Sequence, residues 1–486
     1  MINTPVSRIL SGLLFTLCLA VSTLQARVWH VSGVGDDANP GASEKTAFRT
    51  LKKAASVVQP GDTVLLGNGT YTDDNSGADS AVLVLTQHGS PDKWTIWKAA
   101  PGARPEIIAT KGWHAILITG SYYVIDGITL TGGSDSIVMI EAYEDSKIEQ
   151  KDGRRYWGAP RFNTNALSID GRKNDPAQKP HHIIVRNCVV SKFPGGGIGS
   201  IEADYITIED NIVFDNSWFS RHATSGMGSL WNWAHDDKPG YHMIFQRNIL
   251  WNNKTLVPWT AIGKHSDGNG IIVDVTDGSH HAAAVQNTDA AANPNVTNAT
   301  PAPAATPAAT TAARRPNPNA AALNPLRPKW EYRTLIANNI SAFNGGSGIH
   351  TFRARHVDII NNTTYWNGGI VGYQELFANR SVDIVILNNI IVPRPGGRVT
   401  SNNRNEQIVW DYNLYPVEQS VVKGPNDIVA DPMFVKVARD LRDADFRLKK
   451  NSPALHSGTV EFAQPTDLKG KKRPAGKSRD RGAYEQ

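Results

Sequence analysis

The stretch "IVILNNIIV", residues 384–392, places an asparagine between two short apolar runs, and this arrangement decides the fold. The arrangement occurs in six further segments between residues 183 and 415. The recurring asparagines are Asn187, Asn211, Asn248, Asn339, Asn362, Asn389 and Asn413. Their spacings are 24, 37, 91, 23, 27 and 24 residues, so four of the six steps lie near two dozen. Apolar runs repeated at this period are typical of a solenoid, in which each turn buries its apolar face against its neighbours.

Asparagine suits the corner of such a turn. It tolerates left-handed backbone angles, and its amide can bond the equivalent amide one turn away. A second repeated pattern follows four of the asparagines. It places four glycines at equivalent positions of successive turns, which we call a row, Gly197, Gly226, Gly270 and Gly348. Alternation along the strand then sends two further rows outward, Gly199, Gly228, Ile272 and His350, and Ile201, Leu230, Asp274 and Phe352. The repeat therefore predicts an all-β chain folded as a parallel β-helix.

The ends of the chain and one internal segment depart from the repeat. Residues 1–26 combine a basic residue with an apolar run, which predicts a signal peptide and a secreted or periplasmic protein. The β-helix domain is expected over residues 27–486, with a helix near 50–58 that caps its first turn. Residues 279–328 are rich in Ala, Pro, Thr and Asn, which predicts a disordered loop inserted in one turn.

Composition excludes several classes of partner. The formal net charge is +5, and the tail at 465–486 holds seven Lys and Arg against two Asp in "DLKGKKRPAGKSRDR". We therefore expect a solvated basic tail on a nearly neutral body, and no nucleic-acid partner, because no aromatic residues interleave with the basic ones. Beyond the first segment, no run approaches the ~20 apolar residues of a membrane span. Removal of the signal leaves Cys188 alone, so we expect no intrachain disulfide, and we expect a monomer.

The opening segment, the asparagine-cornered turns, "DGNGIIVD" at 267–274 and the closing "DPMFV", "DFRL" and "GAYE" resemble the pectate-lyase-like superfamily of right-handed parallel β-helix proteins. The "DGNGIIVD" strand is most similar to the "DGNGFK" strand of polysaccharide lyase family 9. This resemblance implies a single-stranded right-handed parallel β-helix. It also implies calcium-dependent β-elimination of an acidic polysaccharide, with a lysine base and clustered aspartates that hold Ca²⁺. Ile272 stands where that family has its lysine.

β-Elimination requires a neutralised uronate carboxylate and a base close to the acidic proton. The candidate Ca²⁺ ligands are aspartates, Asp236, Asp237, Asp267 and Asp274. His350 occupies the outward row of Ile272 on the next turn, which makes it a candidate base, and Lys264 competes for that role. Arg353 is the candidate that positions the substrate carboxylate in bidentate fashion.

Further polar and aromatic residues near these positions are candidate substrate contacts, His265, Arg355, Glu375, Trp231 and Trp233. Tryptophan faces stack on sugar rings, although the same residues can pack beneath loops. A glycoside hydrolase is the alternative function, because it needs two carboxylates across the cleft, and several acids on the turns can supply them. A non-catalytic carbohydrate-binding or surface β-helix protein is the third interpretation.

Overall fold

The computed structural model describes residues 26–72, 81–278, 327–462, 464–473 and 478–486. The predicted signal peptide and the predicted insertion therefore lie outside the described residues, except for a residue or two at their inner ends.

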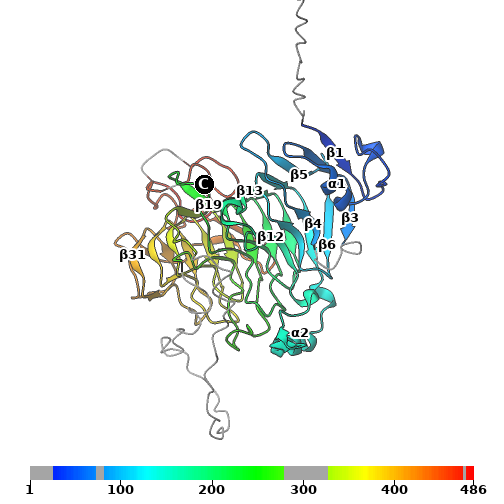
Figure 1. Cartoon of the computed structure of the whole chain (residues 1–486). Helices are drawn as coiled ribbons and strands as arrows, with labels where there is room; N and C mark the ends of the chain where they lie inside the picture. Colours follow the sequence, from blue (N-terminus) through cyan, green and yellow to red (C-terminus); the bar gives the residue numbers. More distant parts are fainter. Residues whose placement is uncertain (1–25, 73–80, 279–326, 463, 474–477) are drawn as a thin grey trace, which may run out of the picture.

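The described chain winds as a parallel β-helix, and each turn adds one strand to each of three long sheets (Figure 1). We name them the groove sheet, sheet 1 and sheet 2, in the order in which a turn visits them. The groove sheet contains β4 (Ala81–Leu85), β7 (His114–Ile118), β12 (Asn165–Asp170), β15 (Ile198–Ile201), β18 (Met227–Leu230), β21 (Ile271–Asp274), β24 (Ile349–Phe352), β27 (Leu376–Asn379) and β30 (Asn402–Asn403).

Sheet 1 contains β1 (Val28–Val31), β2 (Thr63–Leu66), β5 (Thr95–Ala99), β8 (Tyr123–Asp126), β13 (His181–Arg186), β16 (Asp204–Glu209), β19 (Tyr241–Gln246), β22 (Arg333–Ala337), β25 (Arg355–Ile360), β28 (Val382–Leu387) and β31 (Glu406–Asp411). Sheet 2 contains β3 (Gly69–Thr72), β6 (Pro105–Ala109), β9 (Thr129–Gly132), β14 (Val189–Ser191), β17 (Ile212–Phe214), β20 (Ile249–Trp251), β23 (Ile340–Ala342), β26 (Thr363–Tyr365), β29 (Ile390–Val392), β32 (Leu414–Tyr415) and β33 (Ile428–Val429). Two short antiparallel pairs stand apart, β10 (Gln150–Lys151) with β11 (Arg154–Arg155) and β34 (Phe434–Lys436) with β35 (Asp445–Leu448).

The core consists of rows of side chains that occupy equivalent positions on successive turns. One row of the groove sheet points inward and is buried throughout, Leu167, Ile198, Met227, Ile271, Ile349 and Leu376. These side chains stack at strand spacing, so each turn removes the apolar surface of the turn before it from water. The pairing of Ile272 with Gly228 and with His350 confirms the predicted outward row.

Asparagines form a continuous ladder at the corner between sheets 1 and 2. Each side-chain Nδ2 donates to Oδ1 of the next member at 2.9–3.1 Å along Asn211, Asn248, Asn339, Asn362, Asn389 and Asn413. The prediction that Asn187 is a member of this ladder is wrong. The buried Cys188 occupies that ladder position and donates its backbone N–H to Asn211. The left-handed residue is the one before each ladder position, as at Asn187 and Asp210.

A second asparagine ladder lies at the corner that leads from sheet 2 into the groove sheet. It runs through Asn216, Asn253, Asn344 and Asn367 and ends on the carboxylate of Glu375. Glu375 is 1% exposed, accepts the Asn367 backbone N–H at 2.9 Å, and has its pKa raised to about 8 by burial. Glu375 terminates a structural ladder inside the protein. This burial favours a structural role for Glu375, and its predicted contact with substrate stays a prediction.

Helices occupy the places where the repeat is broken. The predicted cap is confirmed as α1 (Leu51–Val57), which begins after Thr50, whose Oγ1 accepts the Lys53 N–H at 3.0 Å. The long connection from β9 to β12 contains α2 (Met139–Lys147) (Figure 1). Short 3-10 turns are η1 (Glu44–Thr46), η3 (Ser134–Ser136), η4 (Pro160–Phe162) and η5 (Pro176–Gln178). Within the described ranges, neither helix is long and apolar enough to cross a membrane.

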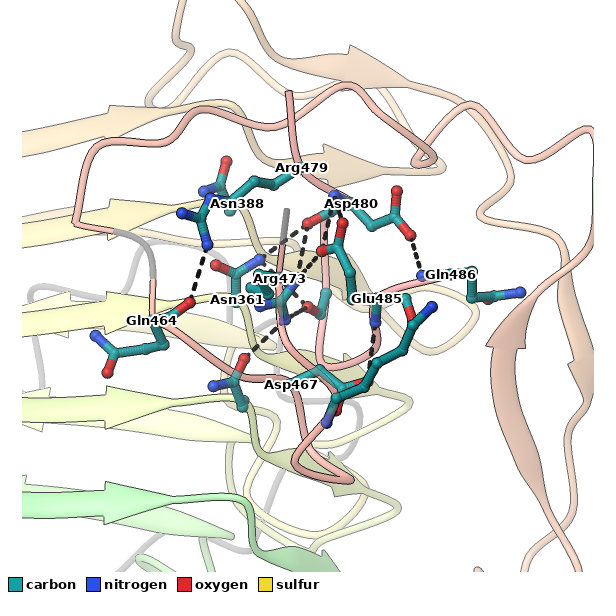
Figure 2. Close-up of polar contacts among 12 residues, drawn as sticks. Asn361, Asn388, Gln464, Asp467, Arg473, Arg479, Asp480, Glu485 and Gln486 are labelled. Atoms are coloured by element: carbon teal, nitrogen blue, oxygen red, sulfur yellow. Dashed lines mark hydrogen bonds and ion pairs between the residues drawn. The ribbon is translucent and has the colours of Figure 1, made fainter. Parts of the chain in front are cut away.

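The prediction that the basic tail is solvated is also corrected, because one of its arginines is buried. Arg473 is 5% exposed, and it pairs with Glu485 at 2.6 Å and donates to Asn338 Oδ1 at 2.7 Å. Figure 2 shows Arg473 and Glu485 inside a polar cluster that also contains Asn361, whose amide donates to the Asp480 carbonyl at 3.0 Å.

The doubled asparagines explain how the tail is held. In "ANNI", "INNT" and "LNNI" the second Asn belongs to the inner ladder, and the first carries a positive φ that turns its amide outward. These first residues, Asn338, Asn361 and Asn388, all hydrogen-bond to residues 459–482. The tail therefore forms a closing strap along the solenoid, held in part by its arginines, and its described lysines, Lys469, Lys471 and Lys472, are exposed.

Candidate active-site groove

A groove of about 760 Å³ runs over the outer face of the groove sheet from β7 to β21. Its floor is the outward row in which Ser168, Gly199 and Gly228 pair in register. A Cβ added at Gly199 would meet only the Gly228 carbonyl oxygen, at 3.9 Å, so that position opens into the groove. The groove exists because this stretch of the row carries almost no side-chain volume.

Two acids of the "DGNGIIVD" segment line this groove, Asp267 and Asp274. Asp274 projects from β21 in the outward row that continues Leu230. Asp267 lies in the turn before the strand with a φ of 61°, and Asn269 Nδ2 donates to its Oδ1 at 2.9 Å. The left-handed turn and the strand thus bring two carboxyl groups seven residues apart in sequence to one surface.

Both carboxyl groups hold protons more tightly than an exposed aspartate. Burial raises the pKa of Asp267 to about 7, against weaker opposing hydrogen bonds from Ser266 and Asn269. Burial raises the pKa of Asp274 well above its ordinary value, and the negative charge of Asp267 adds to this shift. Coupled acids of this kind release their protons as a pair, so near neutral pH the pair retains a proton.

The other end of the groove is polar and carries cations at its rim. Arg172 binds Asp170 through Nε and Nη2 at 3.0 and 2.6 Å. Burial opposes ionisation of Asp170, but the Arg172 guanidinium outweighs it and lowers the pKa of Asp170. His114 hydrogen-bonds through Nδ1 to Ser168 Oγ at 2.8 Å, and burial lowers its pKa to about 4. Lys173 is exposed beside Arg172 and completes the cationic rim.

One wall of the groove comes from the connection that contains α2. The buried Arg221 fastens this connection by donating to the carbonyls of Asp145 and Ile148 at 2.8 and 2.5 Å. This places Trp157, 54% exposed, on the groove beside His222, whose Nε2 contacts the Trp157 carbonyl at 2.8 Å. A carbonyl accepts hydrogen bonds only, so His222 Nε2 carries the proton and Nδ1 keeps a lone pair. Burial lowers the pKa of His222 to about 4.

His350, the predicted base, has the predicted register but lies outside the groove. Its ring is 5% exposed and stacks on Phe377 with centroids 4.1 Å apart, and Tyr373 packs edge-on at 5.5 Å. Neither ring nitrogen has a hydrogen-bond partner among the described residues, and burial lowers the pKa of His350 to about 3. The geometry therefore favours a packed, neutral imidazole, and its catalytic role stays a prediction.

The structure also places the other predicted cations away from the groove lining. Lys264 and His265 are exposed in the turn before Asp267. Arg353 donates to Asp277 at 2.8 Å, and Arg355 faces Glu331 at 3.9 Å. None of these four side chains lines the groove, but Arg353 is near enough to Asp274 for its positive charge to oppose the rise in the pKa of that carboxyl group.

The turn between β18 and β19 holds the remaining predicted residues. Trp231 and Trp233 lie under cations, with Arg327 3.6 Å from the first ring centroid and Lys179 4.7 Å from the second. Asp236 accepts the Tyr205 hydroxyl at 2.5 Å and pairs with Lys238 at 2.8 Å, while Asp237 is exposed. None of these four residues lines the groove, so the four predicted calcium ligands fall into two separate places.

The sequence analysis did not select several groove residues, namely Trp113, His114, Trp157, Asp170, Arg172 and His222. The strand of His114 lies upstream of the first recognised asparagine corner, so the repeat did not assign its outward face. Trp157 comes from an insertion outside the repeat, and only tertiary packing brings it to the groove. The strand alternation of "NALSID" places Asp170 on the same face as Ser168, but its extension to "HAILI" assigns His114 to the inward row of Ile116, so alternation finds Asp170 and not His114.

Comparison of the sequence with family models and with curated proteins gives no match. Comparison of the structure does. A solved structure of pectate lyase Pel9A superposes with a TM-score of 0.50 over 95% of this chain and 96% of that one, at 15% identity. The fold is similar to that of pectate lyase Pel9A. The chain therefore has a parallel β-helix fold, as the resemblance implied.

Other solved structures are similar at lower scores. A rhamnogalacturonan lyase gives a TM-score of 0.43 at 13% identity over 87% of this chain and 97% of that chain. The lacto-N-biosidase of Eubacterium ramulus gives 0.43 at 14% identity over 80% of this chain and 56% of that one. A fold does not by itself assign a reaction, so the groove residues must decide it.

Proposed function

We propose that this protein cleaves a glycosidic bond of a polysaccharide bound in the groove, with Asp267 and Asp274 as the catalytic pair. The observation that supports it is the convergence of two carboxyl groups with raised pKa values on one groove surface. A pair that retains one proton contains both an acid and a carboxylate. The acid donates its proton to the leaving glycosidic oxygen, and the carboxylate attacks the anomeric carbon or activates water. Water supplies the remaining atoms of the products.

Hydrolysis, the alternative interpretation of the sequence, thus becomes the first candidate. The exposed Trp157 offers a face on which a sugar ring can stack at the groove edge. The fold relatives support a carbohydrate substrate, and the predicted signal peptide supports action outside the cytoplasm.

β-Elimination of a uronate polymer is the second candidate, and a different part of the groove favours it. Arg172 and Lys173 at the rim can attract an acidic polysaccharide, and His222 Nδ1 offers a lone pair within the groove. Asp267 and Asp274 supply the carboxylate oxygens that Ca²⁺ prefers, and would hold it together with water and substrate oxygens. Bound there, the cation would neutralise the uronate carboxylate.

One experiment separates these candidates. The purified protein is incubated with neutral and uronate polysaccharides, with and without chelator, and reducing ends and ultraviolet absorbance are followed. Hydrolysis yields reducing ends without absorbance and resists chelator, whereas elimination yields an absorbing unsaturated uronate. Asp267→Asn and Asp274→Asn are compared with Asp237→Asn, a matched exposed aspartate outside the groove. Activity that survives both groove variants contradicts the pair as the catalytic centre, and no product from any substrate supports a carbohydrate-binding protein.

The pH profile gives an independent check. Because the pair must contain one carboxylate and one acid, hydrolysis should decline below about pH 7, where Asp267 gains a proton, and again at higher pH, where Asp274 loses its proton. A kcat/KM profile that is highest well below pH 7 would contradict catalysis by this pair.

A further inference from the structure

Three histidines meet on the surface at the corner between the groove sheet and sheet 1, outside the groove. His181 and His182 open β13, and His235 lies in the turn that leads to β19, two strands further along sheet 1. One ring nitrogen from each lies within 4.8 Å of the other two. Among the described residues, this is the single group of three or more His, Cys, Asp or Glu side chains that converges in this way.

Local backbone geometry explains how consecutive histidines share one side. Successive side chains of a strand normally point to opposite faces. His182 has a φ of 54°, and this left-handed residue breaks the alternation. Its ring then stacks between Tyr122 and Tyr205, with centroids 4.7 and 4.3 Å away. The two Nδ1 atoms of His181 and His182 face each other at 2.8 Å.

The third histidine is positioned by a buried carboxylate. Asp204 is 0% exposed and accepts the His235 backbone N–H at 2.5 Å, which anchors the turn above β13. The His235 ring stacks on the His181 ring with centroids 3.6 Å apart. Asp236 is already occupied by Tyr205 and Lys238, so the cluster presents imidazoles rather than carboxylates.

We propose that His181, His182 and His235 bind one borderline transition-metal ion, of the class of Zn²⁺. Imidazole nitrogens bind Zn²⁺ at about 2.0–2.1 Å, which separates tetrahedral ligands by roughly 3.3 Å. The 2.8 Å gap between the two Nδ1 atoms is close to that separation, and His235 is exposed, so its ring can rotate to close the remaining distance. A metal takes the place of the proton that these two nitrogens share.

The ligand set also predicts selectivity and consequence. Three imidazoles suit Zn²⁺, Ni²⁺ or Cu²⁺, whereas Ca²⁺ requires oxygen ligands. The ion ties the turn at 231–240 to the start of β13, and the fourth coordination position is left to solvent. The site is therefore a metal clamp between turns of the solenoid, independent of the reaction in the groove.

The test is zinc titration of the whole chain, purified without a polyhistidine tag and stripped with chelator. Calorimetry should show one equivalent of Zn²⁺ bound, a raised Tm, and no displacement by excess Ca²⁺. His235→Ala should weaken binding by at least about 100-fold, because even loss of a group that only supports a ligand costs up to that amount. His456→Gln changes a comparably exposed histidine far along the chain and should leave zinc affinity unchanged.

Cobalt gives a second readout that does not depend on stability. Co²⁺ bound by the three imidazoles should develop visible d–d absorption at one equivalent, and His181→Ala combined with His235→Ala should abolish it. Both substitutions lie outside the ring stack of His182, and far-ultraviolet circular dichroism confirms folding. Absence of stoichiometric zinc uptake, or equal uptake by the double variant, would overturn the proposal.

Discussion

Two halves of one row on the groove sheet behave in opposite ways. On β12, β15 and β18 the outward row consists of Ser168, Gly199 and Gly228, and the surface is hollow. On β21, β24 and β27 the same row consists of Ile272, His350 and Phe377, which are 9%, 5% and 3% exposed. Register is identical in both halves, so it cannot decide which residue meets a substrate. Side-chain volume decides it, because large neighbours bury one another and small ones leave a groove.

The largest expected effect separates a residue that lines the groove, Asp274, from a residue of the filled row, His350, by activity. Asp274→Asn should lower kcat by about 10³-fold, because an amide can neither donate a proton as an acid nor act as a carboxylate. His350→Phe, which conserves the ring and its stacking on Phe377, should retain most activity. Steady-state kinetics on the substrate identified above provide the measurement. The reverse pattern would restore His350 as the base and break the comparison.

The second prediction fills the hollow half. Gly199→Phe should place a ring in the groove floor and reduce kcat/KM by about 10²-fold through displaced substrate. Its Cβ meets only a carbonyl oxygen at 3.9 Å, so Tm should change little. Gly199→Ala is the matched control and should remain active, and a Phe variant with full activity would mean that substrate binds elsewhere.

The third prediction concerns acid stability of the filled half. His350 has a folded pKa of about 3, and its unfolded pKa is about 6.5, so below pH 6.5 the unfolded chain binds the extra proton. Above pH 6.5 the burial of a neutral His350 does not lower the free energy of unfolding. Below pH 6.5 the free energy of unfolding declines as the pH falls. His350→Phe removes this penalty. The free energy of unfolding of the variant minus that of the wild type should therefore be about 2 kcal/mol larger at pH 5 than at pH 7. Urea unfolding at both pH values tests this, and an unchanged difference would contradict a buried neutral imidazole.

The smallest expected effect lies at the groove rim. Trp157→Ala should raise KM about 5-fold with little change in kcat, because an exposed ring contributes stacking on sugar but little packing. Trp231→Ala is the control, since Trp231 lies under Arg327 and outside the groove. A larger effect from Trp231 would move the binding surface to the turn at 231–240.

The sequence by itself determined the solenoid. Apolar runs with an asparagine corner define the repeat, strand alternation defines the rows, and "DGNGIIVD" puts Asp267 and Asp274 on one surface. These features are local and periodic, so each turn can be assigned from its neighbours in sequence. The asparagine at 187 was assigned one position early, because Cys188 replaces the ladder amide there.

Only the tertiary structure decided what is exposed. The sequence predicts that Glu375 is a polar surface residue, whereas in the structure it ends an internal ladder. The sequence also predicts a solvated basic tail, whereas Arg473 is buried against Glu485. In the groove wall, Trp157 contacts His222, which lies 65 residues further along the sequence. In the histidine cluster, His181 stacks on His235, which lies 54 residues further along. Exposure depends on the volumes and partners that neighbouring turns supply, and no single turn of the sequence contains that information.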